Sequence, residues 1–313
     1  MQSPKVVVFG MLPEDLLQRI ASTCQVVIAD PRLPDQAERF YEELKTAHGL
    51  IGAGVKLGAA ELAQATELKV ISSVSVGIDN YDQDYLRERG IALHNTPDVL
   101  TETTADTIFA LLLASSRRLV ELANFVRDGK WKKSVGPELY GTDVHGKTLA
   151  IVGFGRIGQA VARRAALGFG MPVVYVNRSK VDVPMLAQSA RQASLDEALS
   201  VADFVALTLP LTPETQGLMG AAQFQRMKAG AIFVNGGRGQ LVQEDALLAA
   251  LDSGHLRAAG LDVFATEPLP LSSPLRNHPK VTALPHIGSA THETRRAMAE
   301  MATNQLLQAL GQA

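Results

Sequence analysis

Three side chains that could take part in catalysis, Arg238, Glu267 and His286, each follow an apolar run in the last third of the sequence. Histidine changes charge near neutral pH and can donate a proton, and a neighbouring carboxylate favours its protonated form. Arginine offers a planar pair of donors to a carboxylate and a positive charge to a carbonyl oxygen. Together these groups are suited to reducing an oxo acid, whose carbonyl oxygen needs a proton. Each residue alone has a structural alternative. Arg238 could form a salt bridge at a sheet edge, Glu267 could cap a turn, and His286 could be a structural histidine.

A glycine-rich turn precedes these residues and predicts a nucleotide site. The apolar run Leu149–Val152 is typical of a buried strand, and a helical pattern runs from Arg156 to Leu167. Between them, the spacing GxGxxG allows a tight turn, a close approach of backbone to pyrophosphate, and close packing of helix on strand. The predicted dinucleotide contacts in this turn are Gly153, Phe154, Gly155, Arg156, Ile157 and Gly158. The alternative is a purely structural turn. A second glycine-rich stretch, residues 52–58, has the wrong spacing and is expected to be a loop that approaches substrate.

The end of the next strand predicts which dinucleotide binds. An NAD site usually has Asp or Glu about 20 residues past the glycine turn, where it accepts bonds from the ribose hydroxyls. Here Asn177 stands at that place, followed by Arg178 and Ser179. Without the carboxylate a 2′-phosphate is not repelled, and a charge-assisted bond to it contributes on the order of 1.5–3 kcal/mol. We therefore expect NADPH to be preferred and NADH to be usable. The alternative is that Arg178 is a solvated surface residue and that both cofactors serve.

Composition bounds the remaining possibilities. With 313 residues, 46% of them hydrophobic and 20% charged, two globular domains are expected. The net charge of −2 gives no reason to expect a nucleic-acid partner. The single cysteine, Cys24, excludes a disulfide within the chain, and no apolar run reaches the length of a membrane span, so a cytoplasmic location is expected. No group of His, Cys and carboxylate residues has zinc-ligand spacing, so no metal is expected.

Short β-branched runs alternate with helical patterns, which predicts parallel sheets covered on both faces. The expected strands are Lys5–Phe9, Gln25–Ala29, Leu50–Gly52, Val70–Ser73, Ala92–His94, Leu149–Val152, Val173–Val176, Phe204–Leu207, Ala231–Asn235, Ala258–Leu261 and Val281–Leu284. The expected helices include Pro13–Ser22, Gln36–His48, Gly58–Ala65, a long helix from Thr101 to Arg127, and a last helix from Thr291 to Leu310. The pattern changes near Pro97. The sequence therefore predicts an α/β fold with two doubly wound, Rossmann-like or flavodoxin-like domains.

The motifs resemble those of the NAD(P)-dependent D-isomer-specific 2-hydroxyacid dehydrogenases over almost the whole chain. The most specific segments are Gly153–Gly158, Val234–Gly239, Gly260–Phe264 with Glu267–Pro268, and Pro285–Thr291. Within the family, Tyr140–His145 and Ser289–Arg295 are most similar to the bacterial glyoxylate/hydroxypyruvate reductases, also described as 2-ketogluconate reductases. The departure from the commoner family pattern is Asn177 in place of Asp.

The resemblance implies a role for each site residue. Arg238 would bind and polarise the substrate, and Glu267 would pair with His286, the acid/base. Backbone amides around Ser75, Val76 and Gly77 would hold the substrate carboxylate. The further implied cofactor contacts are Asp262 at the nicotinamide carboxamide, Thr104 beside the cofactor, and Leu209, Pro210 and Thr215 on the adenosine side.

The resemblance also implies a domain arrangement, with a dinucleotide-binding domain at 99–286 inserted into a substrate-binding domain made of 1–98 and 287–313. Family members are typically dimeric through the long helix and the stretch Asp128–Gly146, so Trp131 and Tyr140 are expected at a homodimer interface.

The expected activity is NADPH-dependent reduction of a small 2-oxo acid to the D-2-hydroxy acid. Glyoxylate and hydroxypyruvate are the first candidate substrates and 2-ketogluconate the next. One alternative is another oxidoreductase of the same fold, such as a phosphite dehydrogenase; a formate dehydrogenase would be expected to have Gln at Glu267. A second alternative is a non-enzymatic module that senses dinucleotides, as in the C-terminal binding protein corepressors.

Overall fold

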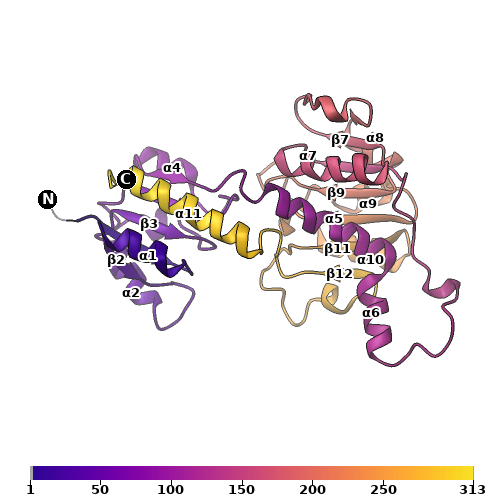
Figure 1. Ribbon diagram of the computed structural model, residues 1–313, viewed down its shortest axis with the longest axis horizontal. Coiled ribbons are helices and arrows are strands. Elements are labelled where there is room, and N and C mark those ends of the chain that lie inside the picture. Colours follow the sequence, from indigo (N-terminus) through magenta and orange to yellow (C-terminus); the bar gives the residue numbers. More distant parts are fainter. Residues whose placement is uncertain (1–2, 313) are drawn as a thin grey trace. The chain divides into compact units, whose positions relative to one another are not determined.

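The structure is a computed structural model that describes residues 3–312. The chain folds into two compact units, one made of the residues up to Leu100 and from Ser289 onward, the other of Thr101–Gly288 (Figure 1). The second unit is inserted into the first. Each junction lies two residues later than the predicted boundaries of 98/99 and 286/287. No helix among the described residues is both long and apolar enough to cross a membrane.

The first unit is a parallel sheet in the order β2-β1-β3-β4-β5. Its strands are β1 (Lys5–Phe9), β2 (Gln25–Ile28), β3 (Gly49–Gly52), β4 (Val70–Ser73) and β5 (Ala92–His94). Its helices are α1 (Glu14–Ala21), α2 (Ala37–Leu44), α3 (Ala59–Leu62), α4 (Gln83–Glu88) and α11 (His292–Ala309). Because side chains alternate along a strand, Val6 and Val8 of β1 pack with α1 and α11, whereas Val7 and Phe9 pack with α2, α3 and α4.

The second unit is a seven-stranded parallel sheet in the order β12-β11-β10-β9-β6-β7-β8. Its strands are β6 (Leu149–Val152), β7 (Val173–Val176), β8 (Ala190–Gln192), β9 (Phe204–Leu207), β10 (Ala231–Asn235), β11 (Leu256–Leu261) and β12 (Val281–Ala283). Its helices are α5 (Thr101–Arg117), α6 (Leu119–Arg127), α7 (Arg156–Arg163), α8 (Leu195–Val201), α9 (Ala221–Arg226) and α10 (Glu244–Asp252). Short 3₁₀ turns lie at Pro137–Leu139, Pro184–Leu186, Gly239–Leu241 and Pro274–Asn277.

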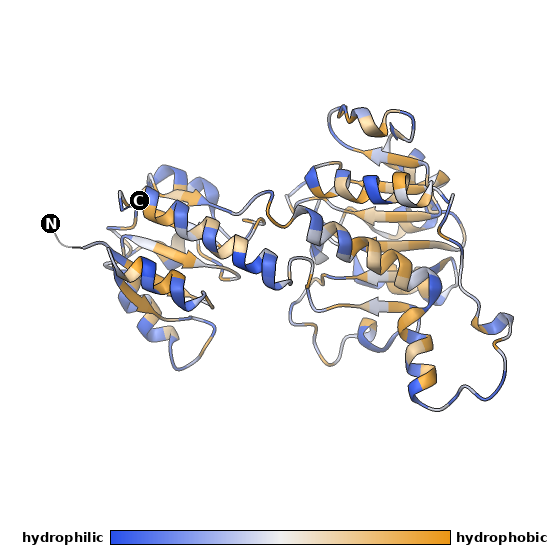
Figure 2. Cartoon of the chain, in the orientation of Figure 1, coloured by the Kyte–Doolittle hydropathy of each residue, from blue (hydrophilic) through white to orange (hydrophobic). Residues whose placement is uncertain are grey.

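Both faces of the second sheet are covered. Leu149 and Ile151 of β6 share a core with α5 and α7, and Ala150 and Val152 share one with α8, α9 and α10. The strands are the most hydrophobic elements, and polar residues lie on the outer sides of the helices (Figure 2). Every strand pair in both sheets is parallel. The predicted fold class, two doubly wound parallel α/β domains, is confirmed.

The prediction of one long helix from Thr101 to Arg127 is wrong. Arg118 adopts the left-handed conformation (φ 55°, ψ 36°) and separates α5 from α6. In a continuous helix the carbonyl of Ser116 would accept a bond within the helix, but here it accepts one from the N–H of Thr142 (2.8 Å). The Arg118 guanidinium then binds Glu121 (2.6 Å). Periodicity does not reveal such a break, because the apolar pattern continues on both sides of it.

Two further elements differ from the predictions. The predicted helix from Arg156 to Leu167 is α-helical only to Arg163 and continues as a π-helical turn, Arg164–Gly168. The edge strand β8 was not predicted from the sequence. Ala190 is half-buried, and Arg191 and Gln192 are exposed. The strand therefore lacks both an apolar run and the β-branched or aromatic residues that are typical of strands.

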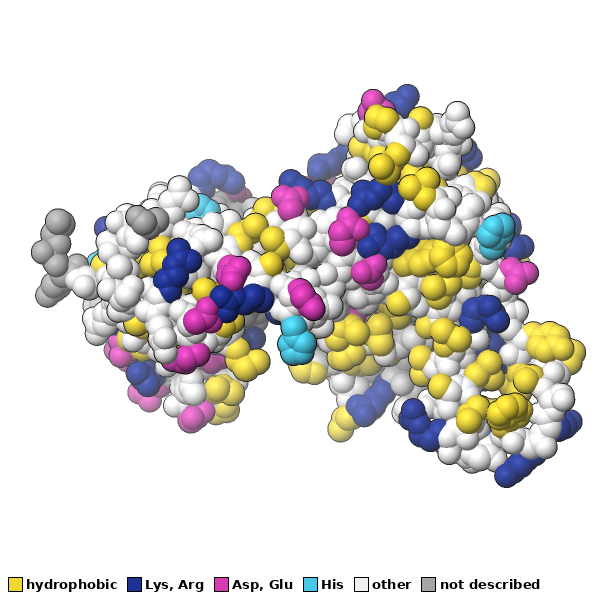
Figure 3. Space-filling model, viewed as in Figure 1, with side chains coloured by type: hydrophobic (Ala, Val, Ile, Leu, Met, Phe, Trp, Pro, Cys, Tyr) yellow, Lys and Arg dark blue, Asp and Glu magenta, His cyan; other side chains and the backbone are white. Residues whose placement is uncertain are grey.

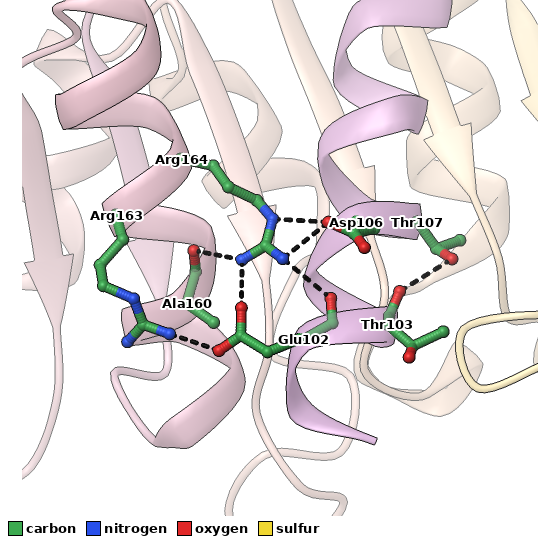
Figure 4. Close-up of polar contacts among 7 residues, drawn as sticks. All are labelled: Glu102, Thr103, Asp106, Thr107, Ala160, Arg163 and Arg164. Carbon is green, nitrogen blue, oxygen red and sulfur yellow. Dashed lines mark hydrogen bonds and ion pairs between the residues drawn. The ribbon is translucent and has the colours of Figure 1, made fainter. Parts of the chain in front are cut away.

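Two arginines join α5 to α7, the helix that follows the glycine turn (Figure 4). Arg164 donates hydrogen bonds to the carboxylates of Asp106 (2.7 Å) and Glu102 (2.8 Å) and to the backbone carbonyls of Glu102 and Ala160. Arg163 also binds the Glu102 carboxylate. This network fixes the first turn of α5, which carries Thr104, against α7.

Candidate active site

The glycine turn after β6 has the geometry that phosphate binding requires. Gly153 has a φ of +101°, which favours glycine. A Cβ on Gly158 would lie 2.2 Å from the carbonyl oxygen of Gly153, so only glycine allows α7 to pack this closely on the turn. A Cβ on Gly155, the N-terminal cap of α7, would meet no described atom within 4 Å. The backbone at the start of α7 is therefore open to a ligand, and the N-terminus of an α-helix favours a phosphate.

Asn177 ties the end of β7 to this turn. Its Oδ1 accepts a bond from the N–H of Phe154 (3.3 Å), and its Nδ2 donates to the carbonyl of Ser179 (2.9 Å). Arg178 and Ser179 are exposed. The three residues thus form a polar, solvent-facing end of β7 next to the glycine turn.

The loop after β9 completes this side of the site. Thr208 donates a hydrogen bond to the carbonyl of Gly153, and a Cβ on Gly153 would lie 2.9 Å from the Leu209 nitrogen. Thr215 accepts a bond from the Thr212 N–H (2.8 Å) and donates one to the Pro210 carbonyl (2.9 Å). Leu209 and Pro210 therefore lie beside the glycine turn. The hydroxyl of Thr215 holds the loop together.

Arg238 lies in a turn that the side chain of Asn235 holds in place. Buried Asn235 accepts a bond from the N–H of Gly237 (3.1 Å) and donates one to the carbonyl of Arg238 (2.9 Å). The prediction from sequence assigned no role to Asn235. A polar residue at the end of a buried apolar strand was the signal that could have indicated its role in the turn. A Cβ on Gly239 would lie 1.8 Å from the carbonyl carbon of Phe264, so this turn packs directly on the segment that leads to Glu267.

Glu267 and His286 form a hydrogen-bonded pair. Nδ1 of His286 lies 2.7 Å from Oε2 of Glu267, and Oε1 of Glu267 accepts a bond from the N–H of Phe264 (2.9 Å). His286 has a φ of +53°, a conformation that is rare outside glycine and costs about 1–3 kcal/mol. Arg238, Glu267 and His286 follow the neighbouring strands β10, β11 and β12, whose carboxyl ends share one edge of the sheet.

Asp262 holds the backbone that follows His286. Its Oδ1 accepts the N–H of Ile287 (2.7 Å) and its Oδ2 the N–H of Gly288 (2.8 Å). These two bonds stabilise the left-handed conformation of His286. A Cβ on Gly288 would lie 3.1 Å from Asp262 Oδ2 and 3.2 Å from Thr104 Cγ2, which places Thr104 next to this turn. The predicted contacts of Asp262 and Thr104 with the cofactor stay predictions.

The two carboxyl groups differ in their electrostatics. Burial raises the pKa of Asp262, and its two backbone hydrogen bonds offset only part of this effect. Burial also acts to raise the pKa of Glu267, but the hydrogen bonds from His286 and the Phe264 N–H, with the nearby charge of Arg238, outweigh it and lower the pKa below its usual value. Glu267 is therefore ionised at neutral pH and can stabilise a positive charge on His286.

The predicted substrate-binding residues Ser75, Val76 and Gly77 belong to the first unit, whereas the other predicted site residues belong to the second. Among residues 3–312, no three His, Cys, Asp or Glu side chains are grouped so that they could hold a metal ion.

Comparisons with known proteins agree with this geometry. The sequence model described as "D-isomer specific 2-hydroxyacid dehydrogenase, NAD binding domain" matches residues 109–288. The chain is 50% identical over 307 residues to a glyoxylate/hydroxypyruvate reductase B from Citrobacter koseri, covering 98% of this chain and 95% of the relative. A solved structure from Thermus thermophilus superimposes with a TM-score of 0.90 at 45% identity, over 98% of this chain and 97% of the other.

A second similar solved structure contains a bound dinucleotide. It is an NADPH-dependent glyoxylate/hydroxypyruvate reductase from Sinorhizobium meliloti in complex with NADP and malonate, with a TM-score of 0.85 and 31% identity over 97% of this chain and 93% of the other. The chain thus belongs to the D-isomer specific 2-hydroxyacid dehydrogenase family. It is an oxidoreductase with a Rossmann-type domain for a nicotinamide dinucleotide.

The lowered pKa of Glu267 predicts an acid-sensitive contribution to stability. Because the folded-state pKa lies below the ordinary value of 4.5, the ionised carboxylate stabilises the fold fully above that value, and this contribution is lost as the pH falls through the folded-state pKa. Urea midpoints of the wild type and Glu267→Gln should therefore differ more at about pH 7 than at about pH 3. The matched control is Asp252→Asn, which removes the exposed carboxylate that pairs with His278 and should have a smaller effect. An equal difference between wild type and Glu267→Gln at both pH values would contradict this assignment.

Proposed function

We propose that this protein uses NADPH to reduce small 2-oxo acids to D-2-hydroxy acids, with glyoxylate and hydroxypyruvate as the first substrates and 2-ketogluconate as the next. The observation that carries the proposal is the pairing of His286 with Glu267 at 2.7 Å, in a site that also contains Arg238. The names of the relatives from Citrobacter koseri and Sinorhizobium meliloti support glyoxylate and hydroxypyruvate as substrates.

His286 acts as the proton donor in this proposal. The nicotinamide, when bound, supplies the hydride that reaches the carbonyl carbon. Since Nδ1 of His286 is held by Glu267, Nε2 is the ring nitrogen that delivers the proton to the carbonyl oxygen. Glu267 orients the ring and stabilises its charged form before the transfer. A positioned general acid of this kind contributes about 10²–10⁴-fold to the rate.

Arg238 binds and polarises the substrate oxygen in this proposal. Its guanidinium donates to the carbonyl of Gly237 (2.9 Å), within the turn that Asn235 fixes. Its charge also acts on Glu267. Fixed donors of this kind stabilise the charge that develops on the oxygen. The backbone amides of the segment Val74–Ile78, which contains Ser75, Val76 and Gly77, are assigned to the substrate carboxylate. Asp262 and Thr104 are assigned to the nicotinamide side, and Leu209, Pro210 and Thr215 to the adenosine side.

The preference for NADPH rests on the end of β7. Asn177 provides no carboxylate to repel a 2′-phosphate, and its side chain is engaged with the glycine turn and with Ser179. Arg178 and Ser179 are exposed there and can donate to a phosphate. A cytoplasmic location is also part of the proposal, supported by the single, buried Cys24, and cell fractionation tests it.

The decisive experiment measures kcat/KM for glyoxylate, hydroxypyruvate and 2-ketogluconate, each with NADPH and with NADH. Turnover of at least one acid with NADPH preferred by about one to two decades is expected, the size of one charge-assisted bond. Equal use of NADH would overturn the cofactor assignment but not the chemistry. Tight NADPH binding without turnover of any acid would overturn the reductase proposal in favour of phosphite oxidation or dinucleotide sensing.

Removal of the proton donor gives a second test. His286→Asn is the suitable variant, because asparagine tolerates the left-handed conformation that this position has. It should lower kcat by about two to four decades while the Kd for NADPH stays nearly unchanged. His278→Asn is the matched control, since His278 also pairs with a carboxylate, that of the exposed Asp252, at a distance of 3.2 Å. Unchanged turnover in His286→Asn would remove His286 from the mechanism.

We further propose that the enzyme is a homodimer joined through α6 and the stretch that follows it. Hydrophobic side chains gather on this part of the surface (Figure 3). The exposed ones are Leu119, Val120, Val126, Trp131, Val135 and Tyr140. A concentration of exposed apolar side chains on one part of the surface is typical of a protein–protein interface. Its occupant in this proposal is the same surface of a second copy.

Sedimentation equilibrium tests the dimer directly. The wild type should have twice the chain mass, and Val126→Asp combined with Trp131→Asp should give monomers, because two charges would be buried in the interface. The control is Leu271→Asp, which alters an even more exposed hydrophobic side chain elsewhere in the same unit. A monomeric wild type, or an unchanged mass in the double variant, would refute this interface.

A further inference from the structure

The three carbonyl groups that follow Val74, in the segment after β4, are each bound by a separate donor of the first unit. The carbonyl of Ser75 accepts a bond from the N–H of Thr96 (2.9 Å). That of Val76 accepts one from the side-chain amide of Asn95 (2.8 Å). That of Gly77 accepts one from the hydroxyl of Ser75 (2.7 Å). The directions of three successive carbonyl groups are therefore fixed.

These bonds also fix the direction of three N–H groups. A peptide group is planar and trans, so each carbonyl points away from the N–H of the next residue. The donors on the carbonyls of Ser75, Val76 and Gly77 thus orient the N–H groups of Val76, Gly77 and Ile78. Within residues 3–312, the structure gives these three N–H groups no hydrogen-bond acceptor. Successive N–H groups held this way favour an anion.

A chain of hydroxyl groups supports Ser75 from the interior. Because the Ser75 hydroxyl donates its proton to Gly77, it must accept from the hydroxyl of Ser73 (2.7 Å). The hydroxyl of Ser73 in turn accepts from that of Tyr81 (3.1 Å). Ser73 and Tyr81 are buried. Each hydroxyl has one proton, so the pattern has a single direction, from Tyr81 to Gly77, and it ends on the carbonyl that orients the N–H of Ile78.

We propose that Ser75 and Asn95 are positioning residues for the substrate carboxylate. They act through the carbonyls of Gly77 and Val76, and they hold the N–H groups of Ile78 and Gly77 in the direction in which a carboxylate binds. Asn95 is suited to this role because its own carbonyl is held by Gln305 of α11 (3.0 Å). The inference rests on the proposed reductase function, which assigns the substrate carboxylate to this segment.

The test compares Ser75→Ala with the wild type. Loss of one orienting hydrogen bond should raise both the KM for hydroxypyruvate and the inhibition constant of oxamate, a carboxylate that is not reduced, by about 5- to 20-fold. The kcat at saturating substrate and the Kd for NADPH should change less than about twofold, since hydride and proton transfer involve other residues. Ser75→Thr keeps the hydroxyl and should restore both constants. Asn95→Ala should give the same pattern and serves if Ser75→Ala does not fold.

Ser72→Ala is the matched control. Ser72 is the neighbouring buried serine of β4, but its hydroxyl donates to the carbonyl of Ala302 in α11 (2.7 Å) and does not contact the segment. It should lower stability without changing KM. Unchanged KM and oxamate inhibition in folded Ser75→Ala, or an equal change in Ser72→Ala, would overturn the inference. If the wild type reduces no oxo acid, the proposed function fails, and the affinities of wild type and Ser75→Ala for oxamate still decide whether Ser75 orients the anion-binding amides.

Discussion

The carboxylate of Asp262 is the interaction on which the catalytic geometry depends. By accepting the N–H groups of Ile287 and Gly288, it compensates for the left-handed backbone of His286 and directs the imidazole toward Glu267. Burial of this carboxylate is unfavourable, and the hydrogen bonds from the two amides offset part of that cost. One buried acid thus holds the backbone beside a strained residue that pairs with Glu267 and is the proton donor of the proposed mechanism.

The sequence predicted the features that depend on local pattern. Apolar runs located eleven of the strands that the structure contains, and the spacing of Gly153, Gly155 and Gly158 predicted a turn whose close contacts the structure shows. The residues Arg238, Glu267 and His286 could be grouped from sequence because each follows a strand, and parallel strands bring their carboxyl ends to one edge of the sheet. Family resemblance supplied the inserted arrangement of the domains, which periodicity does not contain.

Features that depend on long-range contacts could not be predicted in this way. The break at Arg118 occurs because Thr142, far along the chain, takes the carbonyl of Ser116. The groups that support the segment Ser75–Ile78 by hydrogen bonds also come from other parts of the chain: from β4, from Tyr81 and from the residues after β5. In each of these contacts, the residues around either partner in the sequence do not indicate the other.

When main-chain N–H groups bind an acid, the binding of its carboxylate does not depend on which side chains the segment carries. A charged side chain would bind the carboxylate and shape the site at the same time. In the proposed function, the N–H groups of the segment after β4 bind the carboxylate that all candidate substrates share, and hydrogen bonds from Ser75, Asn95 and Thr96 to the carbonyls of the segment set their direction. The side chains of Val76 and Ile78 make none of these bonds. Substitution of the Val76 side chain therefore leaves the bonds that direct these N–H groups in place, whereas the side chain of Ile78 packs on the core of the first unit. In the proposed reductase, such a division lets one scaffold take different acids while Arg238, Glu267 and His286 stay the same.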